Sequence, residues 1–177
     1  MFYRVFLDYE SIEAIDMQGT PAARRLDLNR PIHPERQFDV VLCIGTVEHV
    51  FNVGQAFRTI HELTAPDGII LMAMPFTGWL DHGFYSFQPT FYFDLAAANG
   101  YGLHTLVYCE LNPYKVESLM NRQAAIKMAQ EKRLGENSAL YAMFRKPGEE
   151  KGFQPPIQGY YAGALTKEAR DAWDTMR

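Results

Sequence analysis

The stretch FDVVLCIGTVEHVFN, residues 38–52, decides the fold class that the sequence predicts. It opens with the apolar run Phe38–Ile44, which is typical of a strand buried on both faces of a sheet. Asn52 then offers a side-chain oxygen as a helix N-cap, and Gln55 follows at the spacing of a capping box. Apolar residues recur at helical spacing from Ala56 onward. A buried strand followed closely by a helix indicates an α/β fold.

Similar patterns alternate on both sides of this stretch. The further strands that we expect are Ser11–Asp16, Arg24–Leu28, Gly68–Pro75, Leu103–Glu110 and Ala139–Arg145. The further helices that we expect are Pro89–Asn99, Asn121–Leu134 and Thr166–Met176, while the first helix should stop at the turn Ala65–Gly68. The order predicts a Rossmann-like, mostly parallel sheet with an antiparallel last strand. We expect an α/β domain over residues 1–145 and a loop-rich tail with a short helix over residues 146–177.

Composition narrows the classes of function. The 177 residues carry 17 basic and 21 acidic side chains, a net charge of −4, and neither half is strongly basic, so nucleic-acid binding has no support. The longest apolar stretch, Ile69–Met74, is far shorter than a membrane span. The first residues lack the pattern of a signal peptide, and we expect a cytoplasmic protein. Cys43 and Cys109 lie in apolar runs and are expected to be buried, reduced thiols.

Two acidic residues follow the first two expected strands. In parallel sheets ligands bind beyond the carboxyl ends of the strands, so Asp16 would be placed to accept hydrogen bonds from ribose hydroxyls. A turn-forming role before Gly19 explains Asp16 equally well. Asp27 would similarly accept from an adenine amino group, or else form an Asx turn into Asn29.

A second group of polar residues follows the strand Phe38–Ile44. Gly45 would let a ligand approach the backbone at the strand end. Glu48 near a helix N-terminus is favoured by the helix dipole without any functional role. His49 fits a general base, and a hydrogen-bonded structural histidine fits the spacing equally well.

A third group lies in the aromatic segment after Pro75, which contains Asp81, His82 and Tyr85. Loops in this position often carry function, and groups that exchange protons among aromatic rings suit a substrate pocket. The aromatic residues fit a satellite core or a subunit contact as well. Glu48 and His49 are merely adjacent, and no metal-ligand spacing is present, so we expect no metal site.

Six blocks between residues 10 and 110 resemble the class I S-adenosylmethionine-dependent methyltransferases. They are EAIDMQG, RRLDLNRPI, QFDVVLCIGTVEHVFN, ELTAPDGIILMAMP, DHGFYSFQPTFYFDL and ANGY. The resemblance implies S-adenosylmethionine as cofactor and a small-molecule acceptor. It assigns cofactor binding to Asp16, Met17, Asp27, Leu28, Ile44, Gly45, Thr46 and Glu48. It assigns catalysis to His82 as the first candidate base, His49 as the second, and Tyr85.

The sequence departs from the family at its N-terminal end. The family begins with a strand and a Gly-rich turn of the type D-x-G-x-G, and no such turn precedes Asp16. We therefore expect an N-terminally incomplete sheet, since two strands would lose a central neighbour. Three explanations stay open: a truncated copy of a longer enzyme, a second chain that supplies the strand, or a degenerate, non-catalytic fold. The function is either methyl transfer, impaired by the missing turn, or that of a non-catalytic partner or scaffold that pairs with another chain or with a second copy.

Overall fold

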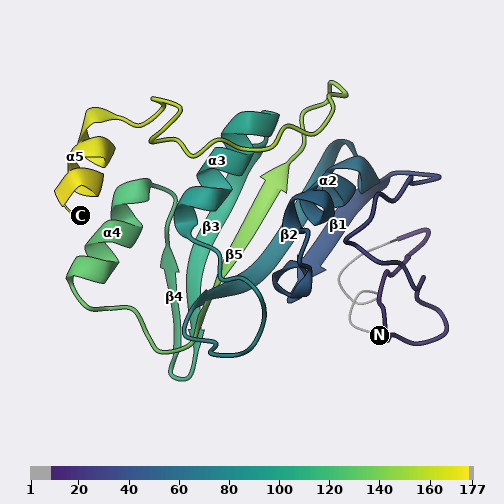
Figure 1. Cartoon of the computed structure of the whole chain (residues 1–177), viewed down its shortest axis with the longest axis horizontal. Coiled ribbons are helices and arrows are strands. Elements are labelled where there is room, and N and C mark those ends of the chain that lie inside the picture. Colours follow the sequence, from purple (N-terminus) through teal and green to yellow (C-terminus); the bar gives the residue numbers. More distant parts are fainter. Residues whose placement is uncertain (1–8, 176–177) are drawn as a thin grey trace.

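Five strands form one mixed sheet in the computed structural model, which describes residues 9–175 (Figure 1). The strands are β1 (Phe38–Ile44), β2 (Thr64–Thr77), β3 (Gly102–Leu111), β4 (Tyr114–Ser118) and β5 (Ser138–Arg145), in the spatial order β1-β2-β5-β3-β4. The helices are the short 3-10 turn η1 (Val47–His49), α2 (Val53–Leu63), α3 (Pro89–Asn99), α4 (Arg122–Gln130) and α5 (Lys167–Thr175). Helix α2 packs on β1 and β2, and α3 packs on β3 and β5. The predicted α/β fold is confirmed.

The direction of the strands differs from the prediction. Only β1 and β2 run parallel, while β2–β5, β5–β3 and β3–β4 are antiparallel, so the expected mostly parallel sheet is wrong. The two N-terminal strands that would have added parallel pairs do not form. Their segments share one parallel bridge, between Ile15 and Arg24. Ile12 and Met17 are exposed there, so little apolar burial offsets the entropy of ordering these segments.

Strand β1 lies at an edge of the sheet and is covered on one face. Cys43 is buried beneath α2, whereas Val40, Leu42 and Ile44 on the opposite face are 40%, 37% and 59% exposed. The prediction of a strand buried on both faces is therefore wrong. The reason is its place in the sheet: β2 is the sole strand paired with β1 among residues 9–175.

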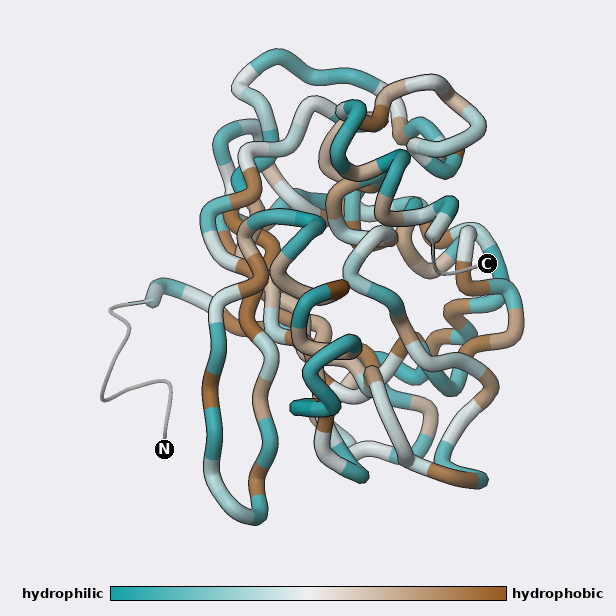
Figure 2. Tube along the Cα trace, turned by 90° about the vertical axis from the view of Figure 1, so that its left-hand side faces the viewer, coloured by the Kyte–Doolittle hydropathy of each residue, from teal (hydrophilic) through white to brown (hydrophobic). Residues whose placement is uncertain are grey.

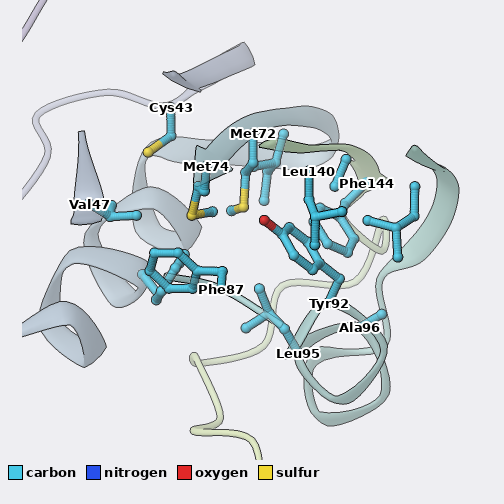
Figure 3. Packing of buried hydrophobic residues seen from close by; sticks show 14 of the residues in the cluster. Cys43, Val47, Met72, Met74, Phe87, Tyr92, Leu95, Ala96, Leu140 and Phe144 are labelled. Carbon is cyan, nitrogen blue, oxygen red and sulfur yellow. The ribbon is translucent and has the colours of Figure 1, made fainter. Parts of the chain in front are cut away.

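The core fills the space between the sheet and helices α2 and α3. Figure 3 shows Met72 and Met74 of β2, Leu140 and Phe144 of β5, and Tyr92 of α3 meeting there. The two cysteines are buried and free, as predicted. Burial raises the pKa of the Cys43 thiol to about 12, so Cys43 stays a neutral thiol at physiological pH. In Figure 2 hydrophobic and hydrophilic positions alternate along much of the chain, as expected for elements with one covered face.

The helix ends follow the predicted signals closely. The Asn52 side chain accepts a hydrogen bond from the Gln55 amide at 3.4 Å and caps α2. Pro89 begins α3, and Gly100 ends it in the left-handed conformation with φ 66°. The expected turn Ala65–Gly68 is wrong, because α2 ends at Leu63 and these residues already belong to β2. Strand β4 was not foreseen from the sequence.

The segment after β5 lies across the helices rather than apart from them. Its Phe153 is buried in the core, and the Gln154 amide donates to the side-chain oxygen of Asn99 at 2.8 Å. The Gly159 amide donates to Asp94 Oδ2 at 2.9 Å, and α5 packs on α4. The division at residue 145 stays a prediction. In the described part of the chain, no helix has the length and apolar character needed to cross a membrane.

Candidate functional site

A cavity of about 200 Å³ opens where β1 and β2 end. Its walls include Ile44 at the end of β1 and Gly45 directly after it, Pro75 near the end of β2, and Tyr141 of β5. Glu48 and His82 reach the same cavity from η1 and from the loop after β2. The cavity therefore lies at the carboxyl ends of the parallel strand pair, where α/β folds bind their ligands.

Gly45 turns the chain from β1 into η1. Its φ of 64° lies in the left-handed region, and its amide donates to the Ala73 carbonyl at 2.9 Å, which extends the β1–β2 pairing. A Cβ added at Gly45 would meet only Glu48 Oε1 at 3.6 Å, so the space beside it is open. The Thr46 hydroxyl contacts the Ile44 carbonyl at 3.4 Å. This tight turn directs Glu48 inward and leaves His49 exposed.

Glu48 is the centre of the site. Its carboxylate is 1% exposed, and Oε1 lies 3.8 Å from His82 Nε2 and 3.9 Å from His49 Nε2. The two imidazole rings meet edge to face, with their centroids 4.9 Å apart. The second oxygen, Oε2, is buried and has no hydrogen-bond partner among residues 9–175. A buried carboxylate with an unpartnered oxygen is costly, and it is therefore a marker of function.

The loop that carries His82 is clamped to the start of β5. Gly78, Trp79 and Asp81 all have positive φ, at 69°, 55° and 57°, which costs a non-glycine residue about 1 kcal/mol or more. The backbone amide of Trp79 donates to Asn137 Oδ1 at 2.9 Å, and its indole N–H donates to the Ser138 carbonyl at 2.8 Å. These bonds hold a conformation that the loop would not otherwise favour.

The same loop is also tied to η1. The amides of Phe84 and Tyr85 donate to the Glu48 carbonyl at 2.7 and 3.3 Å. A Cβ at Gly83 would come within 2.9 Å of that carbonyl oxygen, so only glycine permits the approach. Tyr85 does not join the cavity lining, because its hydroxyl donates to the Phe51 carbonyl at 2.8 Å.

The N-terminal candidates do not line this cavity. Asp16 is exposed, and its Oδ1 accepts from the Gln18 amide at 2.8 Å, while Met17 is exposed beside it. Asp27 Oδ1 accepts from the Asn29 amide at 2.9 Å, and this bond holds the pKa of the Asp27 carboxyl below its usual range. Both acids thus form the turns that the sequence offered as the alternative. Leu28 packs partly buried against the core.

The profile of a methyltransferase domain family matches residues 2–132 of the chain. The chain belongs to this family. The match covers strands β1 to β4 and the side chains of Glu48, His49 and His82, and it supports membership of the class I S-adenosylmethionine-dependent methyltransferases. Methyl transfer is the activity that the family implies. No curated protein matches the chain.

Glu48, His49 and His82 were identified as candidates from the sequence, but their contact with one another was not foreseen. Glu48 and His82 are separated by a helix and a strand, so no spacing rule joins them. The clamp of Trp79 by Asn137 was missed entirely, because nothing in the sequence near Asn137 distinguishes it from an ordinary loop residue. The glycine in Asp81-His82-Gly83 is the one local sign that a backbone must approach closely at this point.

Proposed function

We propose that the protein transfers the methyl group of S-adenosylmethionine to a small-molecule acceptor bound beside Glu48 and His82. The observation that carries the proposal is the pairing of the buried Glu48 carboxylate with the His82 imidazole at 3.8 Å on the cavity wall. A carboxylate held next to an imidazole orients the ring and stabilises its protonated form. This pair suits the removal of a proton from an acceptor hydroxyl.

The remaining roles follow from position. His49 lies 3.9 Å from the same carboxylate oxygen and is the second candidate for the proton acceptor. Tyr85 acts through the backbone: its hydroxyl on the Phe51 carbonyl and its amide on the Glu48 carbonyl hold the loop against η1. Alignment of acceptor and methyl group supplies most of the rate in such displacements, so these positioning contacts matter as much as the base.

The residues at the strand end fit the methionine side of the cofactor. Gly45 leaves open space at the cavity wall, and a ligand there would contact Ile44 and Gly45, whereas Thr46 lies outside the lining and its assignment stays a proposal. The cofactor supplies an electrophilic methyl group on a sulfonium. Asp16 with Met17, and Asp27 with Leu28, would hold its ribose and adenine, and these assignments stay proposals. A bound nucleoside would have to draw both segments toward the cavity.

Titration with S-adenosylhomocysteine, followed by calorimetry, tests the proposal. We expect binding in the micromolar range with one molecule per chain. Gly45→Ala should weaken it by about tenfold or more, because its Cβ would stand in the open space beside Glu48 and its φ would be strained. Asp16→Ala should weaken it similarly, whereas Asp39→Ala, at an exposed acid near the start of β1, is the matched control. Saturating ligand with neither heat nor a thermal shift would refute the enzymatic function.

A second candidate function is that of a partner domain that pairs through β1. The exposed row of Val40, Leu42 and Ile44 on an edge strand favours it, since open edges invite pairing with another strand. Sedimentation velocity distinguishes the cases: we expect a species heavier than the 20.3 kDa chain if β1 pairs between copies. Leu42→Lys should then restore the monomer, and a wild-type protein that is already monomeric contradicts pairing between copies.

A further inference from the structure

We propose that Glu48, His49 and His82 form a binding site for a divalent metal ion of the zinc class. Two imidazoles and one carboxylate are the donor set of several catalytic zinc and non-haem iron sites. The sequence indicated no such site, because its spacing rules detect ligands on one element. Here His82 comes from a different loop, and the fold alone brings it to the other two residues.

The distances between the three side chains are close to those in a site that holds a metal ion. One ligand atom from each of the three side chains lies within 4.8 Å of the other two. The carboxylate oxygen Oε1 is 3.9 Å from His49 Nε2 and 3.8 Å from His82 Nε2. Two donors on a tetrahedral zinc ion, each about 2.1 Å from the metal, are about 3.4 Å apart. Small side-chain rotations therefore suffice to complete the coordination.

Burial of the carboxylate is an independent indication of a cation. Glu48 is 1% exposed, and its Oε2 has no hydrogen-bond partner among the described residues. Taking a carboxylate out of water without a full set of partners is energetically costly. A divalent ion at the His49–His82 end of Glu48 supplies the missing positive charge.

The site is open on one side. The histidine side chains are 45% and 40% exposed, and His82 and Glu48 also line the cavity at the end of β1. Three protein ligands with an open position distinguish catalytic from structural zinc sites. The open position faces the cavity and suits an oxygen of a ligand or water. A nitrogen bound to the ion does not accept a proton, so in the loaded protein the ion takes over the activation of an acceptor hydroxyl from His82.

Metal binding is measurable without cofactor or acceptor, so its outcome is separate from that of the methyl-transfer proposal. Untagged protein comprising residues 1–177, stripped with chelator, is titrated with Zn²⁺ by calorimetry, and with Co²⁺ by visible absorption. We expect one ion per chain with a dissociation constant in the micromolar range or tighter. Bound Zn²⁺ should also raise the thermal midpoint, because the ion binds the folded state.

Two variants locate the ion. His49→Ala and His82→Ala should each weaken binding by about tenfold or more, and both side chains are exposed enough for the variants to fold. His104→Ala removes an exposed histidine on β3 and should leave binding unchanged. The proposal is overturned if the wild-type protein takes up no ion, or if the first two variants bind it as tightly as His104→Ala does.

Discussion

The buried charges of Lys146 and Glu48 differ in how completely their polar atoms are hydrogen-bonded. Each residue is 1% exposed. The Lys146 ammonium donates to the carbonyls of His61 and Thr64 at 3.1 and 2.8 Å, and to Glu150 at 3.1 Å. The Glu48 carboxylate has an oxygen with no hydrogen-bond partner among residues 9–175. A buried charge whose hydrogen-bonding groups all have partners stabilises the fold. A buried charge that lacks a partner lowers the stability of the fold, and such a loss is typical of functional sites.

The largest effect on stability should come from Lys146→Met. The substitution keeps the apolar stem and removes the ammonium that donates to the His61 carbonyl, in the last turn of α2, and to the Thr64 carbonyl just after it. Because hydrogen bonds from a charged donor are lost and two carbonyls stay buried, we expect the free energy of unfolding to fall by about 3 kcal/mol. Urea denaturation measures it. Glu150→Gln, at the exposed partner, should cost less than about 1 kcal/mol. A similar loss for both variants would contradict the comparison.

Replacing Glu48, the other buried charge, by methionine should increase the stability of the protein. Glu48→Met removes a buried carboxylate whose Oε2 lacks a partner, and a methionine fills nearly the same volume. We expect the metal-free protein to gain about 1 kcal/mol in unfolding free energy, while Zn²⁺ binding is lost. Urea denaturation in chelator and calorimetry with Zn²⁺ give the two results. A lower unfolding free energy for Glu48→Met would show that Glu48, like Lys146, stabilises the fold.

Some features of the fold could be predicted from the sequence, and others could not. Local signals located the strand Phe38–Ile44, the Asn52 cap, and the helix between Pro89 and Gly100. The direction of the strands was not foreseen, because the antiparallel pairing of β5 with both β2 and β3 depends on contacts between residues far apart in the sequence. The segment Ser11–Asp16 carries a strand pattern, but it has only the Ile15 bridge and remains exposed.

The site shows the same limit. The types of residue at Glu48, His49 and His82 were identified from the sequence, but their convergence on one carboxylate depends on tertiary contacts. Those contacts are the amides of Phe84 and Tyr85 on the Glu48 carbonyl. Backbone hydrogen bonds between distant segments leave no pattern in the side chains. Lys146 was missed for the same reason, since a lysine after a strand looks like a solvated residue.

His61 is a buried residue with a hydrogen-bond partner at each ring nitrogen. Its ring nitrogens lie 2.6 Å from the Tyr101 hydroxyl and 2.6 Å from the Lys151 carbonyl. The carbonyl can only accept, so Nε2 carries the proton and Nδ1 accepts from Tyr101. Burial, with a smaller contribution from the charge of Lys146, lowers the pKa of His61.

This lowered pKa predicts a loss of stability in acid. Below about pH 6.5 the unfolded chain binds a proton on His61 that the folded chain does not, so unfolding is favoured as the pH falls. The unfolding free energy should therefore decline between pH 7.5 and pH 5.5, and it should decline less in His61→Gln. The other four histidines are common to both proteins, so the difference isolates His61. An identical decline in both would show that His61 titrates normally in the folded state.

The smallest effect distinguishes two buried tyrosines. Figure 3 shows the Tyr92 hydroxyl directed toward Met72 and Met74, and this hydroxyl has no hydrogen-bond partner among the described residues. The Tyr101 hydroxyl is bonded to His61. Removing an unsatisfied buried hydroxyl relieves a desolvation cost, whereas removing a satisfied one leaves its partner alone. We expect Tyr92→Phe to raise the unfolding free energy by about 1 kcal/mol and Tyr101→Phe to lower it by about the same amount. Both variants lose one oxygen atom, so opposite signs in thermal or urea denaturation would establish that satisfaction, rather than burial, determines what a polar group contributes to this fold.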